Sequence, residues 1–141
     1  MLFRSQKHLN KVLQEANMEE LESVLNRLFS SIPYNNFTNN KLQNYEGFYA
    51  SVMYAYLASL GCEIIAEDTT NHSRIDISLK MDSLIYLFEI KAVDTPTGKA
   101  LAQIKERKYY QKYEGYDEVY CIGIEFCKEE RNICLFEWEK L

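Results

Sequence analysis

The chain has 141 residues, of which 47% are apolar and 26% charged, a composition typical of one ordinary globular domain. Its net charge of −5 argues against a general basic coat for nucleic acid, although it leaves room for a local basic groove. No run of about 18 apolar residues occurs, and the N-terminus lacks the apolar core of a secretory signal. We therefore expect a cytoplasmic protein that does not enter a membrane.

The N-terminal part of the chain predicts a small helical extension. Residues 5–16 and 18–30 carry apolar side chains at helical spacing, and the Asn-rich stretch 34–41 that follows predicts a loop. We therefore expect a helical N-terminal extension over residues 1–40 and a main domain over residues 41–141.

The main domain predicts a helix, three strands, a second helix and two further strands. In chain order, we expect a helix over 43–60, strands over 62–67, 74–80 and 84–93, a helix over 99–113, and strands over 118–126 and 132–138. The second and third strands are close enough in sequence to form an antiparallel hairpin, whereas the helix after them makes the third and fourth strands parallel. This order predicts an α/β fold, with a mixed central sheet of about five strands flanked by helices.

The four cysteines do not have the spacing of a metal site. Cys62, Cys121, Cys127 and Cys134 form no CxxC pair, and both histidines lie far from them in the sequence. Because three of the four lie in predicted strands, we expect reduced, half-buried thiols at Cys62, Cys121 and Cys134.

Three charged residues stand out on the second and third predicted strands. Glu89 and Lys91 end an apolar run that begins at Leu84, and as residues i and i+2 they share one strand face. Ionised groups at such a place are costly unless they are paired or bound to a metal. Asp76 on the neighbouring strand, Glu89 and the carbonyl of Ile90 are the hard oxygen ligands that Mg²⁺ takes, with Lys91 beside them. The alternatives are a solvated strand face for Asp76 and a structural ion pair for Glu89 and Lys91.

The two helices of the main domain add further candidates. Glu46 lies near the start of the first, where it either interacts with the helix dipole or adds a third carboxylate to the strand ends. Gln103 on the second helix can reach back to the same strand ends. That helix is also basic and rich in tyrosine, which suits nucleic acid, although a solvated amphipathic helix is the alternative. Its basic residues are Lys99, Lys105, Arg107, Lys108 and Lys112.

The order of these motifs resembles that of the PD-(D/E)XK nuclease superfamily. The matching segments are YEGFYASVMYAYLASLG, SRIDISL, YLFEIK, ALAQIKERKYYQKY and GIEF, so the likeness covers about residues 43–138. A D…ExK pattern alone occurs by chance in many proteins, whereas the ordered set is far more specific. The most similar branch is the nuclease-like bacterial domain found C-terminal to an AAA-ATPase-like domain. This chain contains no GxxxxGK[ST] motif, so it cannot bind ATP through a P-loop.

The resemblance implies a restriction-endonuclease-like fold with an α-β-β-β-α-β core and a role for each matching residue. It implies that Asp76 and Glu89 bind a metal, that Glu46 assists it, and that Lys91 is catalytic with support from Gln103. The implied cofactor is Mg²⁺, for which Mn²⁺ substitutes.

Two functions of different classes remain open at this point. The first is a metal-dependent nuclease that hydrolyses phosphodiester bonds of nucleic acid, with DNA as the favoured substrate. The second is a catalytically inactive module of the same fold that binds nucleic acid or protein. The expected partners besides nucleic acid are a further copy of the chain, in a homo-oligomer, or a separate ATPase-like domain.

Overall fold

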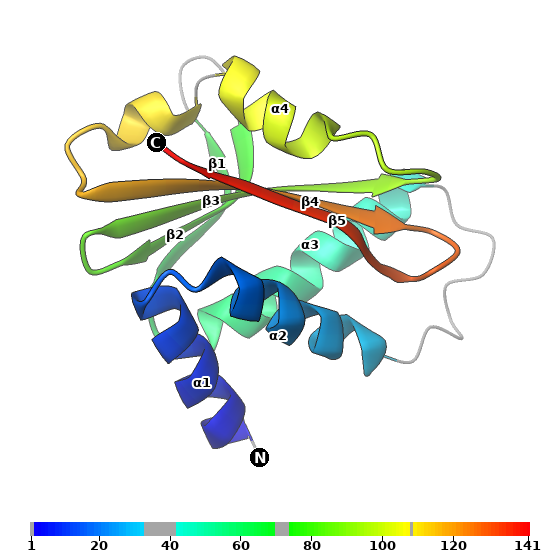
Figure 1. Cartoon of the computed structure of the whole chain (residues 1–141), viewed down its shortest axis with the longest axis horizontal. Helices are drawn as coiled ribbons and strands as arrows, with labels where there is room; N and C mark the ends of the chain where they lie inside the picture. The colour runs from blue at the N-terminus through cyan, green and yellow to red at the C-terminus, as the bar shows by residue number, and fades with distance from the viewer. Residues whose placement is uncertain (1, 33–41, 70–73, 108) are drawn as a thin grey trace.

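The structure is a computed structural model that describes residues 2–32, 42–69, 74–107 and 109–141 (Figure 1). Within these segments, five strands form one mixed sheet with helices on both faces, which confirms the predicted α/β fold. The elements are α1 (Leu2–Gln14), α2 (Met18–Ser30), α3 (Leu42–Ala58), β1 (Glu63–Thr69), β2 (Arg74–Met81), β3 (Leu84–Val93), α4 (Lys99–Arg107), the 3₁₀-helix η1 (Tyr109–Tyr113), β4 (Glu118–Cys127) and β5 (Asn132–Lys140).

The strands lie in the sheet in the same order as in the chain, β1-β2-β3-β4-β5. β3 and β4 pair in parallel because α4 connects them across one face of the sheet, and the neighbouring pairs are antiparallel. The β4–β5 ladder shifts register between Glu125 and Phe126. The α-β-β-β-α-β core expected from the order of the elements is therefore present as α3, β1, β2, β3, α4 and β4.

The larger part of the core lies between the sheet and helices α1, α2 and α3, which cover one face (Figure 1). Tyr49 of α3 stacks on Phe126 of β4 with ring centroids 4.0 Å apart, and Phe29 of α2 meets Phe126 edge-on at 4.6 Å. Because α1 and α2 contribute to this core, they pack as part of the same body. The division of the chain near residue 40 stays a prediction, since the stretch 34–41 lies outside the described residues.

A smaller apolar cluster lies on the opposite face, between the sheet and α4 with η1. Ile85 and Leu87 of β3 contact Ile104 of α4 and Tyr113 of η1 there. The single helix predicted over 99–113 was wrong in its second half, because the α-helix ends at Arg107 and a 3₁₀-helix follows. Aromatic side chains lose rotamer freedom in an α-helix, and the tighter turn brings the last tyrosine against the sheet.

Among the described helices, none combines the length and the apolar character needed to cross a lipid bilayer.

Candidate active site

The two faces of β3 have different surroundings, and this decides which residues share a site. Tyr86, Phe88 and Ile90 belong to the core beneath α1–α3, whereas Ile85 and Leu87 face α4. Since side chains alternate along a strand, the residues that continue the α4 face are Glu89 and Lys91. On β2, Ile77 and Leu79 face the large core, so Asp76 lies on the α4 face as well. The alternation therefore brings Asp76, Glu89 and Lys91 to one side of the sheet.

Asp76 replaces a strand partner at the point where β2 and β3 separate. The β2–β3 ladder ends with the pair Ile77↔Phe88, and beyond it the N–H of Ile90 donates to Asp76 Oδ2 at 2.8 Å. The N–H and C=O of one strand residue point to the same side, so the Ile90 carbonyl also faces this open edge. The sequence-predicted carboxylate and carbonyl are therefore on the same edge of β3.

Glu46 of α3 accepts from β3 as Asp76 does, at an amide two residues further along the strand. Its Oε2 accepts a hydrogen bond from the N–H of Ala92 at 3.2 Å, so the N-terminal part of α3 lies over the end of this strand. A favourable interaction with the helix dipole is thus not the whole role of Glu46. Two carboxylates from different elements satisfy successive outward-facing amides of the same strand edge.

Glu89 is the most deeply buried charged residue of this group, with 6% of its surface exposed. Its pKa is raised to about 8, mainly by burial and also by the nearby Asp76 and Glu46 carboxylates, while Lys91 and Arg107 oppose the shift. The buried Oε2 of Glu89 has no hydrogen-bond partner among the described residues. A buried acceptor without a partner is costly, so this oxygen is suited to a ligand.

Gln103 and Arg107 lie on the flank of α4 that faces this group. Ala100 and Ile104 turn the helix onto the sheet, and Lys105 contacts Glu139 of β5 at 2.9 Å on one side. Gln103 is about 200° around the helix from Lys105, so it faces the β3 side, and Arg107 one turn later follows it. Arg107 acts on the charge of Glu89, which agrees with this placement. The buried Oε1 of Gln103 has no hydrogen-bond partner among the described residues.

The predicted basic surface of this helix is divided by the fold. Lys105 forms an ion pair with Glu139 on the β5 side. The ammonium of Lys112 lies 5.6 Å from the centre of the Tyr113 ring, and Lys80 of β2 lies 5.1 Å from the centre of the Tyr116 ring. Lys99 begins α4 and is exposed. Lys108 lies outside the described residues. Among the described basic residues of this predicted surface, Arg107 is the one whose charge acts on Glu89.

Two residues of β4 that sequence reasoning missed position α4 over the site. Gly123 is in register with Glu89, and a Cβ built on it would lie 2.2 Å from the backbone nitrogen of Leu101. Glu125 is in register with Lys91, is 1% exposed, and accepts hydrogen bonds from the start of α4. The available signal was an acid inside the apolar strand run GIEF, the same signal that identified Glu89.

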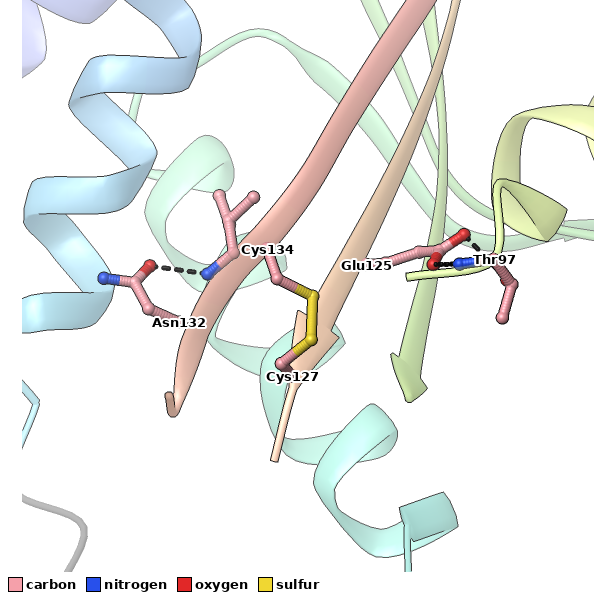
Figure 2. The surroundings of a disulfide bond; sticks show 6 residues. Thr97, Glu125, Cys127, Asn132 and Cys134 are labelled. Atoms are coloured by element: carbon pink, nitrogen blue, oxygen red, sulfur yellow. Dashed lines mark hydrogen bonds between the residues drawn. A yellow bond between two sulfur atoms is a disulfide. The ribbon is translucent and has the colours of Figure 1, made fainter. Parts of the chain in front are cut away.

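The expectation of a reduced thiol was wrong for Cys134. Cys127 at the end of β4 and Cys134 in β5 form a disulfide with Cα atoms 5.6 Å apart (Figure 2). The register shift after Glu125 brings Cys134 beside Cys127, and periodicity alone does not predict such a shift. Cys62 and Cys121 are free thiols, as expected.

Metal-ligand geometry is not preformed in the described part of the chain. No group of three His, Cys, Asp or Glu side chains there is arranged to hold a metal ion. Asp76 and Glu46 each direct one oxygen to an amide of β3. A carboxylate accepts at both oxygens, so these bonds are compatible with a further ligand.

Comparison with known proteins identifies a family and a relative. The sequence model of the PD-(D/E)XK nuclease superfamily matches residues 44–136, about two thirds of the chain. A protein of Azotobacter chroococcum mcd 1, described as an uncharacterised protein in the vnfD 5′ region, is 40% identical over 123 residues. The alignment covers 86% of this chain and 24% of that relative, so the chain spans about a quarter of the relative's length. The matched region contains every element from which the acidic group is built.

Proposed function

Because the chain belongs to the PD-(D/E)XK nuclease superfamily, we propose that it is a metal-dependent nuclease that hydrolyses phosphodiester bonds of nucleic acid. The observation that carries the proposal is the environment of Glu89. Its carboxylate is buried, one of its oxygens has no partner among the described residues, and two further carboxylates act on its charge. A divalent cation would relieve both the unsatisfied oxygen and the mutual repulsion.

The oxygen ligands available at this place suit Mg²⁺, with Mn²⁺ as a substitute. Asp76 and Glu89 would hold the ion, the Ile90 carbonyl would complete its protein ligands, and Glu46 would assist from α3. When bound, the ion would lower the pKa of a water molecule and stabilise negative charge on the phosphate. The acceptors are all oxygens, which hard cations prefer over nitrogen and sulfur ligands.

We assign to Lys91 the role of orienting the attacking water. It lies on the α4 face next to Glu89, with which it interacts electrostatically, and a lysine there donates to the water or to an oxygen of the scissile phosphate. Gln103 faces the same group from α4 and is assigned to support Lys91 or the phosphate. The catalytic set is thus Asp76, Glu89, Lys91 and Gln103.

Nucleic acid would approach over α4 and η1, where the basic residues lie. We assign contacts with the phosphate backbone to Lys99, Arg107, Lys108 and Lys112. Lys105 belongs to the same predicted set, but its ion pair with Glu139 makes it less available for a phosphate contact. DNA stays the favoured substrate.

Metal titration tests the proposal without requiring a known substrate. Calorimetry with Mg²⁺ and Mn²⁺ should show binding by the wild-type protein that is lost in D76N and in E89Q. The matched control is E118Q, the same substitution as E89Q at the first residue of β4, in register with Leu84, and it should bind metal as the wild type does. Absence of binding at millimolar metal would reject the nuclease proposal.

The second candidate, a catalytically inactive module that binds nucleic acid or protein, is favoured by a different observation. Asp76 and Glu46 each bond to a backbone amide of β3, and no three acidic side chains of the described residues form a ready metal site. Under this alternative the carboxylates would serve to cap the open edge of β3. The same titration separates the two candidates, because the module would not bind metal.

Partner domains remain part of the proposal. The curated relative is about four times longer than the region it shares with this chain, which agrees with a nuclease-like domain working beside another domain. We propose that an ATPase-like domain or a second copy of the chain is such a partner.

A further inference from the structure

We propose that Glu125 is a positioning residue that fixes α4 over the acidic site, so that Gln103 is held at the working distance from Lys91 and Glu89. This inference rests on the proposed nuclease function. It concerns a residue of the GIEF segment to which the resemblance gives no role.

Glu125 is unusually buried for a carboxylate. Its side chain is 1% exposed and lies in a strand whose neighbouring residues are apolar. A carboxylate at such a place is costly unless its oxygens are satisfied. Both oxygens are satisfied, and the partners, Thr97 and Ala100, lie at the entry to α4. Figure 2 shows Glu125 bonded to Thr97.

The hydrogen bonds of Glu125 converge on the residues that begin α4. Oε1 accepts from the N–H of Thr97 at 2.7 Å, and Oε2 accepts from the Thr97 hydroxyl at 3.1 Å and from the N–H of Ala100 at 3.5 Å. The Thr97 hydroxyl in turn accepts from the N–H of Lys99 at 3.1 Å. A carboxylate on β4 therefore caps the first turn of α4 across the fold, where the helix dipole favours a negative charge.

β4 pairs in register with β3, the strand that carries the site. Gly123 and Glu125 are in register with Glu89 and Lys91, respectively. Gly123 lets the backbone of α4 lie directly against β4, and Glu125 fixes the first turn of the helix two residues further along. The two contacts that hold α4 are therefore made beside the two charged residues of β3.

The consequence concerns Gln103, one turn after Ala100. Its position relative to the site depends on how the first turn of α4 is held, because both residues are on one short helix. Placement errors of about 1 Å in a catalytic group cost on the order of a hundredfold in rate. Loss of the cap should therefore lower turnover through Gln103, without removing any group that touches the substrate.

A double-mutant cycle tests this route. Turnover numbers at saturating nucleic acid and Mg²⁺ are measured for the wild type, E125Q, Q103A and the double variant, with E118Q as the control of the same chemistry on the same strand. We expect E125Q to lose on the order of tenfold to a hundredfold, and the double variant to be hardly slower than the slower single variant. Losses that multiply would overturn the inference, since a merely structural role of Glu125 has no reason to act through Gln103.

A second measurement decides the question if the wild-type chain does not cleave nucleic acid, in which case the proposed function fails separately. In ¹H–¹⁵N spectra, the side-chain amide of Gln103, assigned by its absence in Q103A, should shift in E125Q and stay in place in E118Q. An unmoved Gln103 signal in E125Q would overturn the inference. Should E125Q fail to fold, T97V deletes the hydroxyl that bridges Glu125 and Lys99 and should give the same shift in a smaller amount.

Discussion

The backbone N–H of Ile90 donates to the Asp76 carboxylate at 2.8 Å, just beyond Ile77↔Phe88, the last pair of the β2–β3 ladder. The two strands thus separate at the residue where the proposed metal ligands begin. Asp76 stabilises the open edge of β3 and supplies charge to the site. A residue with two such roles should respond differently to substitutions that remove its acceptor and to those that remove only its charge.

The two roles of Asp76 are separable by comparing D76A with D76N. D76A leaves the Ile90 N–H without its acceptor, and we expect unfolding free energy to fall by about 1–3 kcal/mol. D76N keeps an acceptor oxygen, so it should be clearly more stable than D76A, while metal binding is lost in both. Urea unfolding with calorimetric titration measures both effects. Equal destabilisation by the two variants would show that the hydrogen bond to Ile90 does not stabilise the fold.

Stability of the metal-free protein should fall as the pH rises from about 5 to 8. Burial and the nearby Asp76 carboxylate raise the pKa of Glu89 from its ordinary value of 4.5 to about 8, so in this window the folded state holds a proton that the unfolded state has released. The contribution of Glu89 is fully present below the ordinary value and is lost as the pH rises through the folded value, at up to about 1.4 kcal/mol per pH unit.

The control for this pH dependence is E89Q, which cannot titrate at that position. The difference in unfolding free energy between the wild type and E89Q should change across the window in favour of E89Q at pH 8. Glu20 and Glu118, whose pKa values are lowered by partners, act below the window and cancel in this difference. A difference that is constant with pH would contradict the buried, raised state of Glu89.

Two glycines offer a matched pair for the packing of α4. G123A places a Cβ 2.2 Å from the backbone nitrogen of Leu101, so α4 must move away from β4, and we expect a loss of several kcal/mol or failure to fold. G47A lies in α3 with nothing within 4 Å of the added Cβ, and it should stabilise the helix by roughly 0.5–1 kcal/mol. Thermal unfolding of both variants checks this, and a harmless G123A would refute the close approach of α4.

The basic residues of α4 should not contribute equally to binding of nucleic acid. R107A should weaken binding and reduce the slope of log affinity against log salt by about 1, as for the loss of one phosphate contact. K105A should change that slope less, because Lys105 is held by Glu139 on the β5 side. Fluorescence anisotropy at several salt concentrations measures both. Equal slopes for R107A and K105A would show that the ion pair with Glu139 does not keep Lys105 from contacting nucleic acid.

Much of the architecture was predictable because it depends on local periodicity. Alternation in β2 assigned Ile77 and Leu79 to one face and Asp76 to the other, and the structure confirms that Ile77 and Leu79 lie in the core. The order of helices and strands likewise predicted the crossover between β3 and β4 and hence their parallel pairing.

The contacts that define the site depend on features that periodicity does not carry. The bonds of Asp76 and Glu46 to β3 require that the β2–β3 ladder stop at Phe88, which the hairpin pattern does not specify. The disulfide partner of Cys127 depends on a register shift between two strands. The engagement of Lys105 by Glu139 requires knowing which flank of α4 faces β5.

The most direct test of a metal-dependent nuclease is cleavage of labelled oligonucleotides by the wild type and by K91A, with and without a chelator. We expect Mg²⁺-dependent cleavage by the wild type, and in K91A a loss of about a hundredfold to a thousandfold or more, with fold and metal affinity retained. The control K80A removes a lysine of β2 that lies on the α4 face of the sheet, as Lys91 does, and this variant should cleave normally. Cleavage by K91A at the wild-type rate, or none by a folded wild type that has bound Mg²⁺, would contradict the assignment of this site.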